Sequence, residues 1–221
     1  MTDNKIIRVT GRGSIRLTPD LTRLTLSVQG AELEYADTLA RSSRETEIIK
    51  DTLSGLGFDR SDLKTISFNV DSKYEGYQDE NNNWRQRFVG YEFTHFMKLE
   101  FPSDNELLGR TLFALAHSSV NAELRIGYTV SDTEAAKNQL LGMAVADARA
   151  KAQVLAGEAG VSLGDILSID YSWGQVSFEV TPVNRMLMAD AAPQMAKGSY
   201  AMDIQPDDIE VSDTVTVVWG I

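Results

Sequence analysis

Alternating hydrophobic and polar positions predict several β-strands along the chain. In one of them, Leu24, Leu26 and Val28 are separated by polar residues, which is the period of a strand with one face in the core and one in water. A longer run, from 89 to 101, carries an apolar or aromatic residue at every second position except His95. The same period predicts further strands at 6–10, 14–17, 66–70, 120–130, 167–180 with a break at Gly174, and 211–219.

Three segments repeat hydrophobic residues with the period of an α-helix. The first covers about 35–56, the second follows Ser103–Glu106, and the third follows Ser131–Glu134 and runs to Gly160. Both four-residue segments have the spacing of a capping box, in which a Ser and a Glu side chain satisfy free N–H groups at the start of a helix. Small residues recur on one face of the third helix and predict close packing there: Ala144, Ala148, Ala152 and Ala156.

The predicted order of elements is β-β-α-β-β-α-β-α-β-β, without strict alternation of strands and helices. This order favours an α+β fold, with mixed and mostly antiparallel sheets packed against three helices, over a doubly wound sheet. A single domain over residues 5–221 fits the length of the chain, and so do two intertwined α+β subdomains at about 5–130 and 131–221. Two segments lack a clean period and are predicted as loops, a polar one at 74–87 and a long one at 182–206.

A formal net charge of −11 narrows the range of partners. Phosphate groups are bound by clustered Lys and Arg, so we expect no nucleic-acid partner, and an anionic membrane surface is disfavoured for the same reason. No segment reaches the length of a transmembrane helix, so we expect no membrane insertion. The chain has no cysteine, which excludes disulfides, thiolate nucleophiles and thiolate metal sites.

The N-terminal residues predict a compartment. Met1–Lys5 contain no apolar signal segment, and the first strand follows directly. We therefore expect a cytoplasmic protein. A periplasmic or exported protein whose leader has been trimmed is the alternative.

The two histidines are candidates for chemistry. His95 lies on an apolar strand face between Phe93 and Met97, where a buried neutral imidazole with one backbone partner is one interpretation and a general base or ligand contact is the other. No Ser or Asp is tied to it by a motif. His117 lies near the end of a helix, and two histidines without cysteine predict no transition-metal site.

Three other motifs suggest chemistry but are incomplete. Gly11-Arg12-Gly13 lacks the third glycine and the helix of a dinucleotide site, so a bend in a strand is predicted. Asp79, Asn81 and Asn83 have the spacing of calcium ligands, but the following glycine and glutamate are missing, so a solvated hairpin tip is predicted, with weak calcium binding as the alternative. An acidic group near the C-terminus could support acid–base catalysis or be a solvated face: Asp203, Asp207, Asp208, Glu210 and Asp213.

Two groups of residues suggest binding surfaces. Four methionines in the predicted 182–206 loop suit packing against a partner subunit, a Cu(I) site or reversible oxidation: Met186, Met188, Met195 and Met202. Aromatic residues around 74–91 predict either an exposed patch or ordinary cross-strand pairing: Tyr74, Tyr77 and Trp84, with Phe88 and Tyr91.

Several short motifs recur in a fixed order along the chain. They are Val9-Thr10-Gly11-Arg12-Gly13, Thr18-Pro19-Asp20, Gly90-Tyr91, the alanine-stepped helix up to Gly160, and Pro206, Ile209, Val211 and 215–219 near the end. In this frame the chain resembles the SIMPL domain family, also called YggE-like and formerly a domain of unknown function.

The resemblance implies an α+β fold, with self-association into rings or larger shells in some bacterial members. The family is known mostly from cell-envelope and exported proteins, and some of these are linked to oxidative-stress tolerance. No enzymatic activity is established for it, so no catalytic residues and no cofactors carry over. The positions that match its pattern are interpreted as structural: Gly11, Gly13, Pro19, Asp20, Tyr91, Ala152 and Gly160.

The leading hypothesis is therefore a non-enzymatic, self-assembling protein with a scaffold or stress-related binding role and a possible further protein partner. One alternative is a small-ligand or metal-binding module that uses His95 or the methionine loop. The other is a hydrolase that uses carboxylates of the C-terminal acidic group.

Overall fold

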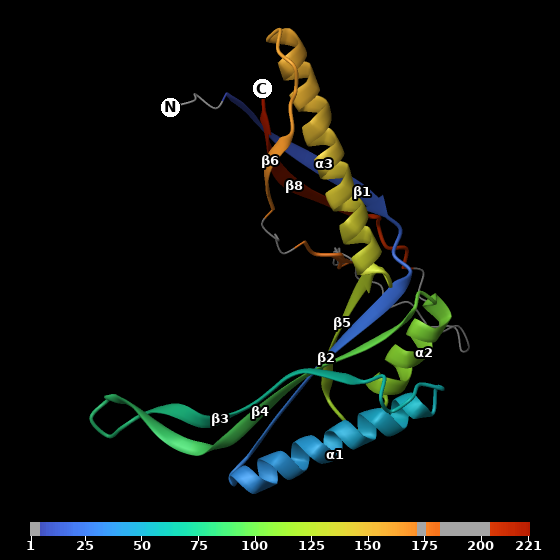
Figure 1. The fold of residues 1–221 in the computed structure, drawn as a ribbon. Helices are drawn as coiled ribbons and strands as arrows, with labels where there is room; N and C mark the ends of the chain where they lie inside the picture. Colours follow the sequence, from blue (N-terminus) through green and yellow to red (C-terminus); the bar gives the residue numbers. More distant parts are fainter. Residues whose placement is uncertain (1–4, 172–175, 182–203) are drawn as a thin grey trace, which may run out of the picture. The chain divides into compact units, whose positions relative to one another are not determined.

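The computed structural model describes residues 5–171, 176–181 and 204–221 of the chain (Figure 1). It divides into two compact units. Unit 1 comprises Met1–Asp20, Thr129–Val180 and Asp207–Ile221, and unit 2 comprises Leu21–Tyr128 and Thr181–Pro206. Both units combine separate stretches of sequence. Whether the chain is a single domain or two intertwined subdomains stays a prediction.

The α+β class and the predicted order of elements are confirmed, and the structure adds a two-residue strand, β7. The helices are α1 (Tyr35–Ser54), α2 (Asn105–Ala116) and α3 (Thr133–Glu158). The strands are β1 (Ile6–Leu17), β2 (Leu21–Glu32), β3 (Lys64–Gln78), β4 (Trp84–Pro102), β5 (Ala122–Thr129), β6 (Ile166–Asp170), β7 (Glu179–Val180) and β8 (Ile209–Gly220).

Unit 1 is a sheet of strand order β1-β8-β6 with helix α3 packed on one face. Strand β1 pairs antiparallel with β8 along its whole length, from Ile6 opposite Gly220 to Leu17 opposite Ile209. Because side chains alternate along a strand, every second residue of β1 and β8 is buried under the helix. The core of this contact contains Val9, Val215, Val217 and Trp219 against the alanines of α3.

The contact between α3 and β1 is very close because both sides carry minimal side chains. A Cβ atom on Gly11 would lie 2.0 Å from the carbonyl oxygen of Ala144, and one on Gly13 would lie 2.1 Å from that of Leu140. Ala144, Ala148 and Ala152 are fully buried, as their periodicity predicts. The predicted bend at Gly11-Arg12-Gly13 is wrong, since β1 runs unbroken through these residues.

Backbone and capping contacts complete unit 1. The carboxylate of Asp20 accepts hydrogen bonds from the backbone N–H and the hydroxyl of Ser131, at 2.7 and 2.6 Å. These bonds lower the pKa of Asp20.

Aspartates cap helices in both units. Helix α3 is capped by Asp132 and not by the predicted Ser131, and α2 is capped by Asp104 and not by Ser103. Aspartate accepts these N–H bonds with a full negative charge, which the positive end of the helix favours.

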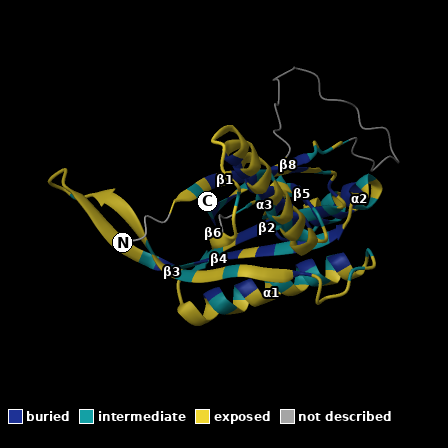
Figure 2. Cartoon of the chain, turned by 45° about the horizontal axis from the view of Figure 1, so that its top comes forward, coloured by how far each residue is buried: buried dark blue, intermediate teal, exposed yellow. Residues whose placement is uncertain are grey.

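Unit 2 contains the strands β3-β4-β2-β5 as neighbours in that order, with α1 and α2 on one face. Leu24, Leu26 and Val28 of β2 share this face with alternate residues of β4, and both helices add leucines and an isoleucine to the same core. The buried positions of α1 follow one side of the helix in Figure 2. This unit carries the candidate sites.

The predicted polar loop at 74–87 is wrong. Strands β3 and β4 continue through it as a paired hairpin, from Tyr74 opposite Phe88 to Gln78 opposite Trp84. None of residues 71–88 is buried, so hydrophobic alternation between core and water, the usual signal of a strand, does not operate there (Figure 2).

Two glycine-to-alanine substitutions should change stability in opposite directions, because Gly11 packs against the backbone of α3 and Gly142 faces open space. Gly11→Ala should lower the free energy of unfolding by about 3 kcal/mol, because the added methyl group meets helix backbone that cannot move aside. Gly142→Ala, on the exposed side of α3 with no atom within 4 Å of the new Cβ, should raise it by about 0.5–1 kcal/mol. Chemical denaturation of both variants measures these changes. A harmless Gly11→Ala would contradict the packing described here.

Candidate functional site

His95 is a buried polar residue in the core face of unit 2. Its side chain is 8% exposed and lies beneath helix α1, on the same strand face as Phe93 and Met97. Its ring meets Phe68 of β3 edge to face, with ring centroids 5.2 Å apart. The burial of this histidine agrees with its position on an apolar strand face, but no motif in the sequence indicates the residues that surround it.

Both ring nitrogens of His95 contact threonine hydroxyls. Nδ1 lies 3.3 Å from Oγ1 of Thr46 on α1, and Nε2 lies 2.9 Å from Oγ1 of Thr65 on β3. Thr46 already donates its one hydroxyl hydrogen to the carbonyl oxygen of Ser42, at 2.8 Å. Its oxygen can therefore only accept from Nδ1–H, which leaves Nε2 to accept from Thr65. This pattern fits a neutral imidazole protonated at Nδ1, with side-chain partners and not the backbone partner that was predicted.

The surroundings of His95 favour its neutral form. Burial lowers the pKa of His95, and the positive charge of Lys50 lowers it further. Lys50 lies on α1, which covers His95, and pairs with Glu47 of the same helix, with Nζ and Oε1 3.2 Å apart. Glu47 also pairs with Arg60, which pairs in turn with Asp51, so the charges beside the histidine balance.

A cavity of about 510 Å³ lies over His95, between α1 and β3. We call it the His95 groove. Six residues of α1 line it at the spacing of one helical face, together with Thr65, Phe68 and His95 from the sheet: Leu39, Ser42, Ser43, Thr46, Glu47 and Lys50. Its volume is within the usual range for sites that hold a small molecule.

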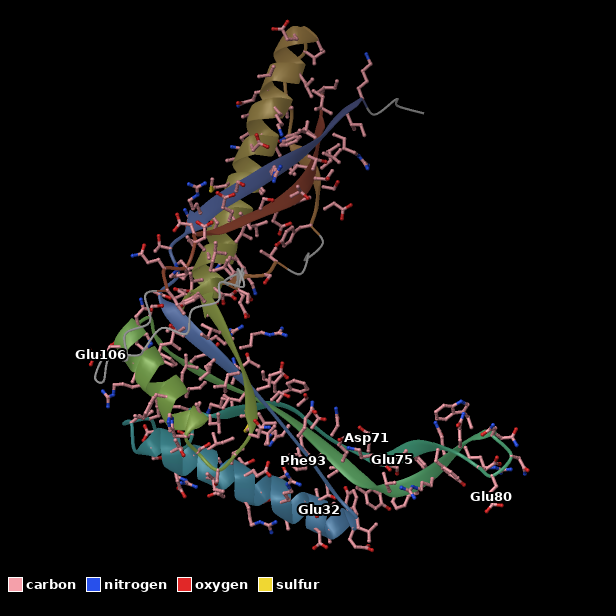
Figure 3. All side chains as sticks on the ribbon, turned by 180° about the vertical axis from the view of Figure 1, so that it is seen from behind. Glu32, Asp71, Glu75, Glu80, Phe93 and Glu106 are labelled. Carbon is pink, nitrogen blue, oxygen red and sulfur yellow. The ribbon has the colours of Figure 1, made fainter. Side chains whose placement is uncertain are left out.

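A second candidate surface lies on the β3–β4 hairpin. Aromatic rings touch one another in sequence: Tyr35 with Tyr91, Tyr91 with Phe88 and Phe88 with Tyr74, at centroid distances of 5.4, 5.2 and 5.8 Å. Trp84 lies over Gly76 on the same side of the hairpin, since a Cβ on Gly76 would meet its ring at 3.8 Å. We call Tyr35, Tyr91, Phe88, Tyr74 and Trp84 the aromatic stripe. It begins at α1 and follows one face of the hairpin outward; in Figure 3 the labels of Glu75 and Glu80 mark the hairpin itself.

A β-bulge makes the aromatic stripe continuous. Tyr91 and Phe88 are three residues apart, so in a regular strand they would face opposite sides. The register shifts between Lys73 and Tyr74, because Gly90 opposes Lys73 and Phe88 opposes Tyr74, which leaves Val89 as the extra residue. The extra residue turns Phe88 to the side of Tyr91. No hydrophobic pattern signals this bulge, although Gly90, with a φ of +135°, marks the place.

The predicted patch of Tyr74, Tyr77 and Trp84 divides between the two faces of the hairpin. Trp84 and Tyr74 are 75% and 57% exposed and belong to the aromatic stripe. Tyr77 opposes Arg85 on the other face, where the Arg87–Glu75 ion pair also lies. Cross-strand pairing and exposure therefore occur together in this hairpin.

Other predicted chemistry has structural explanations in the described residues. Asp79 accepts hydrogen bonds from the backbone of Asn81 and Asn83 and pairs with Arg85, so it closes the hairpin turn. Its pKa is lowered by these contacts, that with Arg85 first. In the acidic group, Glu210 pairs with Arg16, Asp208 accepts from Thr18, and Asp213 accepts from Tyr171. The methionines 186, 188, 195 and 202, and Asp203, lie outside the described residues.

Two features are absent from the described part of the chain. No group of three or more His, Asp or Glu side chains there could hold a metal ion. No described helix is long and apolar enough to cross a membrane.

These features define an α+β protein whose first glycines, central Gly90-Tyr91 and alanine-faced helix all serve close packing or backbone geometry. A family model described as SIMPL, "Protein of unknown function (DUF541)", matches residues 7–219. The chain therefore belongs to the SIMPL family.

Three relatives are similar over most of the chain. "Uncharacterized protein YggE" of Edwardsiella ictaluri is 26% identical over 96% of this chain and 84% of its own length. Proteins named "26 kDa periplasmic immunogenic protein" from Brucella melitensis and Brucella abortus are 28% and 27% identical over 74% of this chain. The match spans 65% of the length of each Brucella protein.

The prediction of a cytoplasmic location is wrong in the light of these relatives. Two of them are named as periplasmic proteins, which points to the periplasm. The prediction rested on the absence of an apolar leader, and such leaders are removed from mature exported proteins. The N-terminal residues therefore do not report the compartment.

The neutral state of His95 predicts a specific pH dependence. A histidine whose pKa is lower in the folded than in the unfolded protein contributes stability above its unfolded pKa, near 6.5, and this contribution is lost as the pH falls through the folded pKa. His95→Gln should therefore lose less free energy of unfolding between pH 7.5 and pH 5.5 than the wild type does, as measured by urea denaturation. Equal pH dependence in His95→Gln and the wild type would contradict a buried neutral imidazole.

Proposed function

We propose that this protein is a self-assembling scaffold and that the aromatic stripe of the β3–β4 hairpin is the surface through which copies associate. The observation that carries the proposal is the stripe itself, in which Tyr35 of α1 is followed by four aromatic side chains of a hairpin that has no buried residue from 71 to 88. A two-stranded hairpin is at best marginally stable in water without a hydrophobic partner. A partner surface over the stripe would supply what is missing.

The exposed area is of the size that an interface between two copies needs. A large aromatic side chain buries about 150–250 Å² when covered, and those of the stripe are about half exposed. The stripe therefore offers roughly 500 Å² per copy. Two stripes laid on one another would bury about 1,000 Å², the lower limit for a specific interface.

The charges of the hairpin favour a second copy as the occupant of the stripe. Copies of a chain with net charge −11 repel one another, so an interface between them must avoid bringing carboxylates together. The stripe itself contains no charged side chain, and Glu32, which lies opposite Tyr91 on the same face, is paired with Arg41. The opposite face carries Glu75, Arg87 and Arg85, with Glu75 and Arg87 paired to each other. The aromatic stripe of one copy can pack against the aromatic stripe of a second copy. Such a contact is two-fold symmetric, which is the commonest arrangement in homo-oligomers.

We place this assembly in the periplasm, as the names of the two Brucella relatives suggest. The proposal contains no enzymatic step. The hydrolase alternative has no support in the described acidic residues, each of which is half-buried or exposed and is used to hold a neighbour. The stress-related role implied by the family resemblance, and the methionine loop as part of an interface, stay predictions.

Removal of the two most exposed aromatic side chains of the stripe should weaken assembly. The double variant Trp84→Ala/Tyr74→Ala should associate about 30-fold more weakly than the wild type, because losing aromatic anchors from an interface costs about 2 kcal/mol or more. Native mass spectrometry and sedimentation over a concentration series measure this change.

Tyr77→Ala provides the matched control, since Tyr77 is an exposed tyrosine of the same hairpin on the opposite face. It should assemble as the wild type does. A wild type that stays monomeric at every concentration, or equal loss of assembly in the control and the double variant, would overturn the proposal.

A further inference from the structure

Helix α1 has polar residues where it faces the sheet. Its buried positions are apolar at the C-terminal end, with Ile49 and Leu53, but Thr38 and Ser42 occupy the same face nearer the N-terminus. Buried polar residues in a core are more informative than exposed apolar ones, because each needs a hydrogen-bond partner. Thr38 donates its hydroxyl hydrogen to backbone carbonyls, whereas Ser42 lines the cavity over His95, which a stability argument alone does not explain.

The hydroxyls of the groove are not all used within the protein. Thr46 and Thr65 are occupied by His95. The side chains of Ser42 and Ser43 line the same cavity, and the structure gives their hydroxyls no hydrogen-bond partner among the described residues. A hydroxyl both donates and accepts, so these two serines offer unused hydrogen-bonding capacity to a molecule in the groove.

The walls of the groove are apolar at one end. Leu39 and Phe68 line it, and Phe68 presents a ring that is 40% exposed. A flat apolar body fits against such a ring in an offset or edge-to-face arrangement. The groove thus combines one apolar wall with a small set of hydrogen-bonding groups, the usual composition of a small-molecule site.

The charges in the groove balance and therefore favour an uncharged ligand. His95 has no charge when it is protonated only at Nδ1, and Lys50 and Glu47, which also line the cavity, pair with each other. A carboxylate or an amine would find no unpaired opposite charge there, since Glu47 neutralises Lys50 and is itself paired with Arg60. An uncharged molecule leaves these ion pairs intact.

We propose that the His95 groove binds a small uncharged molecule with a flat apolar body and a hydrogen-bonding head, such as an aromatic amide. The head contacts the hydroxyls of Ser42 and Ser43 and the Thr65–His95 pair, and the body lies along Phe68 and Leu39. The site is independent of the aromatic stripe, so the two proposals can fail separately.

The two histidines of the chain allow a direct test by NMR of the imidazole nitrogens. Benzamide serves as the test compound, with benzoate and benzylamine as charged molecules of similar size. Benzamide should shift the His95 nitrogens saturably, with half-saturation at about 1 mM as expected for a compound of this size, and should leave His117 unchanged. Both charged compounds should bind at least about 10-fold more weakly. The absence of a His95 shift up to the solubility limit of benzamide, or equal affinity for the charged compounds, would overturn the proposal.

A blocking variant places the binding in the groove. Ser43 is an exposed residue of α1 at the groove, so Ser43→Phe fills the cavity without disturbing the core. It should weaken benzamide binding at least about 10-fold while the native mass of the protein stays unchanged. Arg44→Phe, at the next exposed position and outside the groove, should bind benzamide as the wild type does. Benzamide binding that survives Ser43→Phe unchanged would show that the site lies elsewhere.

Discussion

The backbone at Gly90 is the constraint on which the hairpin of unit 2 depends. A Cβ atom at this position would lie 2.3 Å from the carbonyl oxygen of Glu32, where β2 ends, and the φ of +135° is itself unfavourable for any residue with a side chain. Only glycine therefore lets β4 pass the end of β2 and continue outward. The bulge at Val89 follows directly, and it turns Phe88 to the side of Tyr91. One backbone position thus decides whether the aromatic side chains form one stripe or alternate between two faces.

The two units use small side chains between helix and sheet with different consequences. In unit 1 alanines meet the backbone of β1 at Gly11 and Gly13, and the contact leaves no space. In unit 2 α1 carries serine and threonine where it faces His95, and space remains over the histidine. The first arrangement serves packing, because the helix and the strand meet at backbone distance. The second holds polar groups in position around a cavity, which is the requirement for recognition of a small molecule.

The sequence predicts the elements of this fold well wherever a core enforces a period. The buried strand from Phe93 to Phe101 and the alanine face of α3 are recognisable because one side of each is buried. The paired strands of the outer hairpin, though not its tip, were missed, because none of their residues is buried and their pairing leaves no period in hydrophobicity. The burial of His95 could be predicted, but its partners Thr46 and Thr65 come from different elements, and no local pattern links them. The methionine loop lies outside the described residues and stays a prediction.

Backbone hydrogen exchange across residues 74–88, measured at several protein concentrations, tests the central claim most directly. The hairpin has few neighbours within one chain, so its backbone amides should exchange rapidly when the protein is dilute. When copies associate through the aromatic stripe, exchange of the same amides should slow as the concentration rises, while exchange in the core strand segment 93–101 stays unchanged. Exchange in the hairpin that is independent of concentration, in a protein shown to be oligomeric at the higher concentrations, would contradict assembly through this surface.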